Sequence, residues 1–83
     1  MEITICKGNE YWLVVRFAYA TRYVENMRQI PGARWDRQAR VWKFGYTYLN
    51  VERFIALFDG CPVVVDGELG LECEPLERHF GGA

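Results

Sequence analysis

The sequence predicts a small α+β domain in the order β-β-α-β-β-α, with an antiparallel sheet, two helices on one face and a possible extra strand at the sheet edge. Two patterns lead to this prediction. Short apolar or alternating runs occur in pairs, and each pair is followed by a segment whose apolar residues recur at helical spacing. A chain of 83 residues has room for one domain with one modest core.

Two hairpins are expected. The first has strands at residues 2–7 and 11–17, joined by a tight turn at Gly8-Asn9, because both turn residues tolerate positive φ. The second runs over residues 34–44, where two extended runs flank the polar, turn-like segment 36–40.

Each hairpin is followed by a predicted helix. The first lies within residues 19–30; Thr21 can cap its start, and Pro31-Gly32 ends it because proline disfavours helical geometry at the preceding residue. The second covers residues 50–58 and ends at Asp59-Gly60, where glycine suits a left-handed cap. The residues expected to be mostly buried are Val24, Met27, Ile30, Phe54, Ile55 and Phe58.

The rest of the chain divides into an apolar run and an acidic tail. Residues 61–66 are rich in valine and predict a strand that pairs at one edge of the sheet. After Gly67 the periodic signal fades, and residues 80–83 indicate a frayed end. We therefore predict a folded domain over residues 1–66 and a partly disordered acidic tail over residues 67–83.

Charge is distributed unevenly along the chain, although the formal net charge is only −1. Residues 1–60 hold nine basic and six acidic side chains, whereas residues 61–83 hold one basic and five acidic side chains. Between Arg16 and Lys43 there are seven basic side chains and two acidic ones. A local positive field attracts polyanions, so this middle region is the candidate binding region.

Residues 30–44 carry a motif, which reads Ile-Pro-Gly-Ala-Arg-Trp-Asp-Arg-Gln-Ala-Arg-Val-Trp-Lys-Phe. It resembles the HARP domain, a small DNA-binding module found beside the motor of annealing helicases, and a similar pattern occurs in N-terminal segments of bacterial helicases and recombinases. The resemblance covers about residues 11–59 and implies a HARP-like fold with affinity for nucleic acid. Ala20 stands where the family usually has a polar helix cap. Remodelling activity is not implied, because the chain has no Gly-rich phosphate loop with a following lysine.

The basic side chains around the second hairpin are the main candidates for phosphate contacts, which arginine makes well because its guanidinium binds in a bidentate manner. Trp35 and Trp42 can stack on unpaired bases. The alternatives are that the charges form an ordinary solvated surface and that both tryptophans belong to the core. The candidate nucleic-acid-binding residues are Arg34, Arg37, Arg40, Lys43, Trp35, Arg22 and Arg28.

Catalytic and metal chemistry have little support in the sequence. The side chains that could bind zinc lack the close ligand pairs of zinc sites; they are Cys6, Cys61, Cys73 and His79. Three cysteines without paired spacing suggest reduced thiols in a cytoplasmic protein. Asp36 is explained as a turn residue that accepts backbone N–H bonds. A nuclease would need more carboxylates, and Asp66 and Glu68 do not have a lysine at a useful spacing. We predict no catalytic residue, no metal and no cofactor.

The sequence therefore predicts a non-catalytic module that binds DNA, single-stranded or forked, through phosphate contacts and shape with little sequence readout. A helicase or recombinase domain is a possible further partner; no small-molecule substrate is expected, and no membrane, since no run reaches about 18 apolar residues. The alternative is a protein-interaction module of phage or plasmid type, which would use an aromatic surface or an exposed strand edge such as Val63–Val65. The acidic stretch 66–77 is a solvated edge, folds over the basic hairpin or binds a partner protein.

Overall fold

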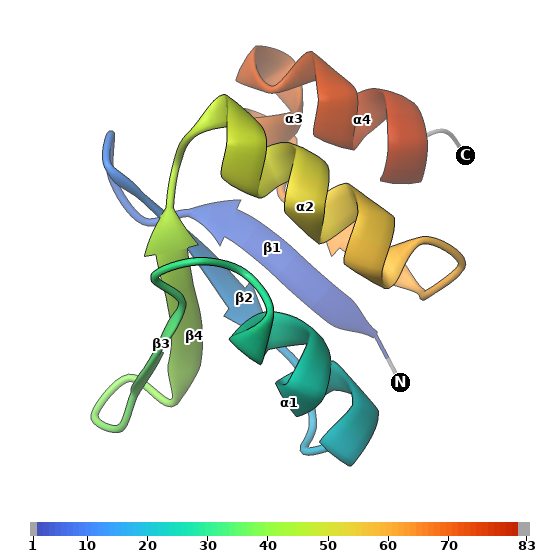
Figure 1. The fold of residues 1–83 in the computed structure, drawn as a ribbon. Coiled ribbons are helices and arrows are strands. Elements are labelled where there is room, and N and C mark those ends of the chain that lie inside the picture. Colours follow the sequence, from blue (N-terminus) through green and yellow to red (C-terminus); the bar gives the residue numbers. More distant parts are fainter. Residues whose placement is uncertain (1, 82–83) are drawn as a thin grey trace.

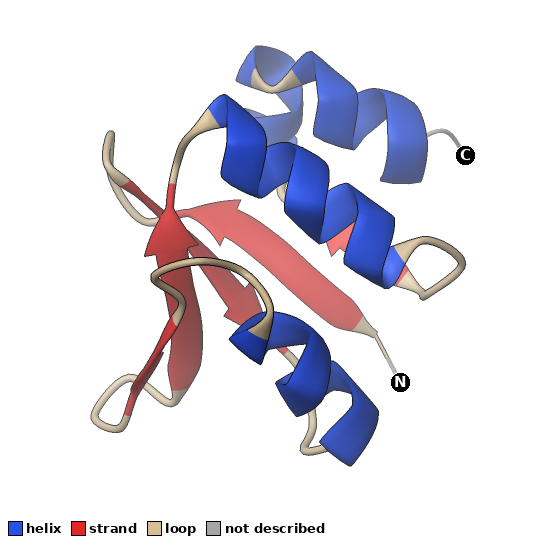
Figure 2. Cartoon of the chain, viewed as in Figure 1, coloured by secondary structure: helices blue, strands red, loops and turns tan. Residues whose placement is uncertain are grey.

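The computed structural model describes residues 2–81. Within these residues, five strands and four helices follow one another (Figures 1 and 2). In chain order they are β1 (Ile3–Lys7), β2 (Trp12–Arg16), α1 (Thr21–Arg28), β3 (Arg34–Asp36), β4 (Val41–Gly45), α2 (Tyr48–Phe58), β5 (Val63–Val65), α3 (Gly67–Glu72) and α4 (Glu74–Phe80). The predicted order β-β-α-β-β-α with an added edge strand is confirmed.

The five strands form one sheet in the order β3-β4-β2-β1-β5. All neighbouring pairs are antiparallel except β1 and β5, which run parallel. The sheet is therefore mostly antiparallel, and α1 and α2 lie over the same face of it, as predicted (Figure 1). The parallel pair is possible because three strands and two helices separate β1 from β5 along the chain.

Side chains alternate between the two faces of the sheet. On one face, residues such as Ile5, Val15 and Phe44 are fully buried beneath the helices. The side chains that point the other way form the open face, which no described helix covers and on which many side chains are exposed or half-buried. The side chains on this open face include those of Trp12, Arg34, Asp36 and Lys43.

Stacked phenylalanines join the sheet to the helices. The Phe54 ring centroid lies 5.8 Å from that of Phe44 on β4 and 4.6 Å from that of Phe58 one turn along α2. Of the six residues predicted to be buried, Met27, Ile30, Phe54 and Phe58 are inaccessible or nearly so. Val24 and Ile55 are only partly buried at the margin of the core, because each lies at the side of its helix's apolar stripe.

Local details of three connections differ from the sequence prediction. The first hairpin turns over four residues, Gly8–Tyr11, instead of two, and the Asn9 side chain accepts hydrogen bonds from the backbone of Tyr11 and Trp12 at 2.7 and 3.0 Å. The cap of α1 is Ala20, whose side chain makes no cap bond, and Thr21 is already helical. For α2, the Thr47 hydroxyl accepts from the Asn50 backbone N–H at 3.2 Å, which starts the helix at residue 48.

The acidic segment differs most from its prediction. A partly disordered tail was expected from residue 67, but residues 67–80 form α3 and α4. Their apolar residues repeat at spacings of four, three and four positions, which places one stripe against the core. That stripe consists of Leu69, Cys73, Leu76 and Phe80. The core thus includes residues from both sides of the boundary drawn at residue 66. Gly82 and Ala83, part of the expected frayed end, lie outside the described residues.

The acidic helices lie far from the basic hairpin. They pack against β5, β1 and α2, and Glu72 accepts hydrogen bonds from Lys7 Nζ at 3.0 Å and Tyr46 Oη at 2.9 Å. Because β5 and β3 form opposite edges of the sheet, about 19 Å separates them at the usual strand spacing. The possibility that the acidic segment folds over the basic hairpin is therefore wrong. The fold separates a basic edge from an acidic one.

Candidate nucleic-acid interface

The turn of the β3–β4 hairpin is held by Asp36. Its Oδ1 accepts hydrogen bonds from the backbone N–H groups of Gln38 and Ala39 at 3.0 and 3.1 Å, and its carbonyl accepts from the Arg40 N–H at 2.7 Å. This is the turn role predicted from the sequence. Arg40 has φ of +57°, a left-handed conformation that costs a residue with a side chain about 1–2 kcal/mol and that glycine adopts without this cost.

Lys43 is partly engaged by the same aspartate. Lys43 Nζ lies 2.9 Å from Asp36 Oδ2, and both side chains are partly exposed. The hydrogen bond from Lys43 and those from the turn backbone hold the pKa of Asp36 below its usual value. The favourable contribution of the ionised carboxylate is therefore present at neutral pH and is lost as pH falls through the lowered pKa. At neutral pH, Lys43 is less available to a phosphate than the arginines around it.

The arginines of the hairpin divide between its two sides. Arg34 and Arg37 line a hollow of about 490 Å³, which we call the basic hollow; its other lining residues are Trp12, Trp35, Asp36, Gln38 and Lys43. Arg34 is paired with Lys43 across the strands, and Trp12 on β2 projects from the same open face of the sheet. Trp12 was not among the binding residues predicted from the sequence. Strand alternation places it on the face opposite to Leu13 and Val15, which are buried, and this was the available signal.

Arg40 lies on the other side of the hairpin, at a pocket of about 660 Å³. Trp35 forms part of its wall and is 48% exposed, whereas Trp42 behind it is only 9% exposed. The core role is thus correct for Trp42 and wrong for Trp35. Arg28, at the last turn of α1, reaches the same pocket. We call this the aromatic pocket, and its lining residues are Phe17, Tyr19, Val24, Arg28, Trp35, Arg40 and Trp42.

Arg22 is the candidate that the structure does not bring to the hairpin. It lies in the first turn of α1, and its Nη2 contacts Cys61 Sγ at 3.8 Å, near the connection between α2 and β5. Phe17 and Tyr19 belong to the pocket but were not selected, since nothing local in the β2–α1 connection shows that it lies beside β3. Their aromatic character was the one available signal.

The arginines at this edge are free of acidic partners. Among residues 2–81, the ion pairs are Lys7–Glu72, Lys43–Asp36, Arg78–Glu74 and His79–Asp59. None of the four arginines that line the basic hollow and the aromatic pocket takes part in one; they are Arg28, Arg34, Arg37 and Arg40. Four guanidinium groups outside these ion pairs, with Asp36 as the acid beside the basic hollow, give this edge an excess of positive charge.

The residues considered for other chemistries do not form a common site. Asp36 lies by β3, whereas Asp66 and Glu68 follow β5 at the opposite edge of the sheet. Within the described part of the chain, no three His, Cys, Asp or Glu side chains are grouped so as to hold a metal ion. Cys73 is buried, Cys6 and Cys61 are half-buried, and burial raises the pKa of the Cys6 thiol. Of these groups, only Asp36 belongs to the basic edge, where it holds the turn and pairs with Lys43.

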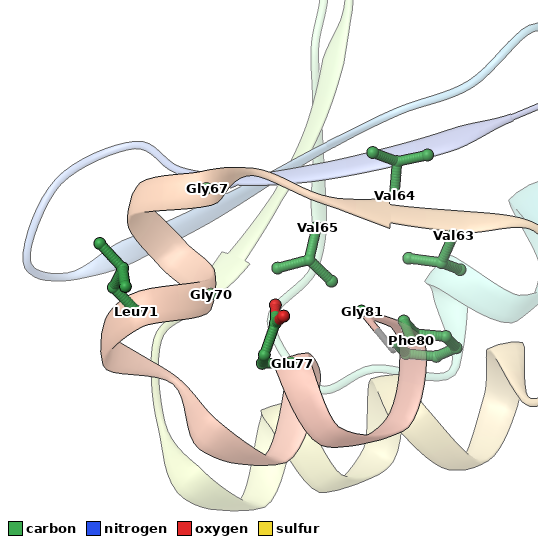
Figure 3. Close-up of a pocket in the computed structure, with 9 residues that line it drawn as sticks. All are labelled: Val63, Val64, Val65, Gly67, Gly70, Leu71, Glu77, Phe80 and Gly81. Atoms are coloured by element: carbon green, nitrogen blue, oxygen red, sulfur yellow. The ribbon is translucent and has the colours of Figure 1, made fainter. Parts of the chain in front are cut away.

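A second surface lies at the free edge of β5. β5 pairs with β1 on one side and has no strand on the other among residues 2–81. A hollow of about 440 Å³, here called the β5 groove, separates this edge from α3 and α4 (Figure 3). Leu71 at its rim is 91% exposed, and Glu77 points into it towards Val65 (Figure 3). This surface combines an unpaired strand edge, apolar side chains and negative charge.

Comparison with known proteins finds no matching family model, no similar curated protein and no similar solved structure. None of the helices in residues 2–81 has both the length and the apolar character needed to cross a bilayer.

Replacing Asp36 with asparagine should make this edge more attractive to a polyanion, for which DNA is the probe. Asparagine keeps an oxygen for the Gln38 and Ala39 N–H groups but loses the charge that holds Lys43, so one more cation becomes available to a phosphate. We expect affinity for DNA to rise about fivefold at 0.1 M salt, and the log–log salt slope to steepen by about 0.7 to 0.9. The control is Glu68→Gln, which removes an exposed acid near β5. An equal gain in both variants would assign the effect to net charge alone.

Proposed function

We propose that this protein is a non-catalytic module that binds DNA with little sequence preference, using the edge of the sheet formed by the β3–β4 hairpin. The observation that carries the proposal is the group of four arginines at this edge, none of which has an ionic partner among residues 2–81. Unpaired arginines on a hairpin and an adjacent helix end are suited to bidentate contacts with phosphate oxygens.

The shape of this edge favours contacts with the phosphate backbone of DNA over contacts with the edges of base pairs. The arginines come from a turn, a three-residue strand and the last turn of α1, so no helix presents a row of side chains to a major groove. The resemblance of residues 30–44 to the HARP domain agrees with such a role. DNA that is single-stranded or forked is the proposed ligand, and a helicase or recombinase domain is a proposed partner in the cytoplasm.

The test is a titration of labelled single-stranded, forked and duplex DNA at several salt concentrations. Four arginine contacts should give a log–log slope of about −3 on single strands and slightly steeper on duplex, with little difference between sequences of the same form. Absence of binding to all three DNAs at low salt would contradict the proposal.

The β5 groove supports a second candidate function, the binding of an extended protein segment. A partner strand could pair with the free edge of β5 while its apolar side chains cover Leu71, and basic residues in it would complement Glu77. Leu71→Glu should abolish such an interaction and leave DNA binding unchanged, because this edge lies across the sheet from β3. An apolar interface would also depend weakly on salt, which distinguishes it from phosphate binding.

A further inference from the structure

The aromatic pocket has features that phosphate contacts alone do not require. Its walls are formed by large apolar rings, and its volume of about 660 Å³ is within the range of small-molecule sites. A phosphate group needs cations and N–H donors but gains nothing from exposed indole or phenol rings. The composition of the pocket therefore indicates a ligand with a flat apolar part as well as negative charge.

Trp35 is both exposed and held in place. Its ring centroid lies 5.7 Å from that of Trp42, which is nearly buried, and β3 is paired with β4 at this position. Tyr19 stands at the same pocket with 78% of its surface exposed. A rigid, half-exposed tryptophan beside a second exposed aromatic ring is suited to stack on a nucleobase.

The two arginines of the pocket come from separate elements. Arg28 belongs to the end of α1 and Arg40 to the hairpin turn. Arg40 occupies a left-handed position where glycine would be less strained, yet the sequence places a long cationic side chain there. Cations around an aromatic pocket match a nucleotide, whose base is apolar on its faces and whose phosphates are charged.

We propose that the aromatic pocket binds one unpaired nucleobase of single-stranded DNA, stacked on Trp35, with Arg28 and Arg40 on the neighbouring phosphates. This inference rests on the proposed DNA-binding function and specifies its substrate. A base inside a duplex has both faces covered by its neighbours, so it cannot enter the pocket without being unstacked. The pocket would thus make the protein prefer single strands or the unpaired arms of a fork.

The experiment compares two labelled oligonucleotides of about 15 nucleotides, one with all its bases and one abasic throughout, so that the phosphates are equal in number. Wild type should bind the strand with bases roughly 5- to 100-fold more tightly, and Trp35→Leu should remove most of this difference while keeping affinity for the abasic strand. Trp12→Leu tests the other position at which a base could stack, because Trp12 lines the basic hollow on the open face; this variant should keep the difference in affinity between the two strands, whatever its effect on the affinity for both.

Tryptophan fluorescence provides a second measurement that does not depend on the stability of Trp35→Leu. In the Trp12→Phe protein, the strand with bases should quench the remaining emission, whereas the abasic strand should quench it much less. Equal affinity of wild type for the two strands would overturn the base-binding inference and leave phosphate binding intact. If Trp12→Leu loses the difference in affinity between the two strands and Trp35→Leu keeps it, the base stacks on Trp12 at the open face, and the inference is wrong. Failure to bind either strand would instead refute the proposed function.

Discussion

Replacement of Phe54 by alanine should lower the free energy of unfolding by about 3–5 kcal/mol, the usual cost of removing a fully buried phenylalanine. The Phe54 ring is inaccessible and stacks on Phe44 and Phe58, and its centroid lies 5.9 Å from that of Phe80 on α4. One side chain therefore contacts the sheet, its own helix and the C-terminal helix. The cavity left by its removal would disturb all three.

Such a loss is comparable to the whole stability expected of a domain this small. Urea titration and thermal unfolding, followed by circular dichroism, would measure the effect. Leu49→Ala is the matched control, because Leu49 lies on the same helix with 77% of its surface exposed, and its loss should change the free energy by at most about 0.5 kcal/mol. A Phe54→Ala protein within 1 kcal/mol of wild type would show that α2 does not pack on the sheet through this face.

The double variant Arg37→Ala, Arg40→Gly should separate DNA binding from stability. The proposed function gives each of these arginines one phosphate contact, so affinity for DNA should fall about 25- to 60-fold at 0.1 M salt, and the salt slope should become shallower by about 1.4 to 1.8. Glycine is chosen at residue 40 because φ is +57° there. Relief of this strain offsets the greater freedom of glycine in the unfolded chain, so stability should be unchanged or up to about 1 kcal/mol higher.

The charge-matched control is Arg53→Ala, Arg78→Ala, which removes two cations from α2 and α4 at a distance from the hairpin. It should alter affinity much less than the hairpin variant. Equal losses in the two proteins would mean that net charge and not the hairpin governs binding. A hairpin variant that loses both affinity and stability would mean that Arg37 or Arg40 supports the fold.

The candidate site was predictable from the sequence only in part. Arg34, Arg37, Arg40 and Lys43 are close in sequence, so any hairpin over residues 34–44 brings them together. Their division between a basic hollow and an aromatic pocket depends on the twist of the hairpin and the path of its turn. The contribution of Arg28 required the connection between α1 and β3 to turn back, so that the end of α1 lies beside Trp35, and the sequence did not predict the path of that connection.

The acidic C-terminal segment is a second feature that the sequence did not predict, because its helices depend on tertiary contacts. Leu69, Cys73, Leu76 and Phe80 have helical spacing, but a six-residue and a seven-residue helix are too short to be stable without packing. The glycines and acidic residues between these positions obscure the helical spacing of the apolar residues. The helices are stabilised only because this apolar stripe packs on the core formed by α2 and the sheet. Here tertiary contacts decide whether helices form.

The sequence by itself determined the order of strands and helices up to residue 66, because strand alternation, helical periodicity and turn chemistry act over a few neighbouring residues. It also determined that basic side chains would gather at one hairpin. Only the tertiary structure decided that β5 pairs parallel to β1, that residues 67–80 are helical, and that the basic and acidic groups occupy opposite edges of the sheet. These features depend on which distant segments bury each other's apolar surface, a choice made by the free energy of the whole packed domain.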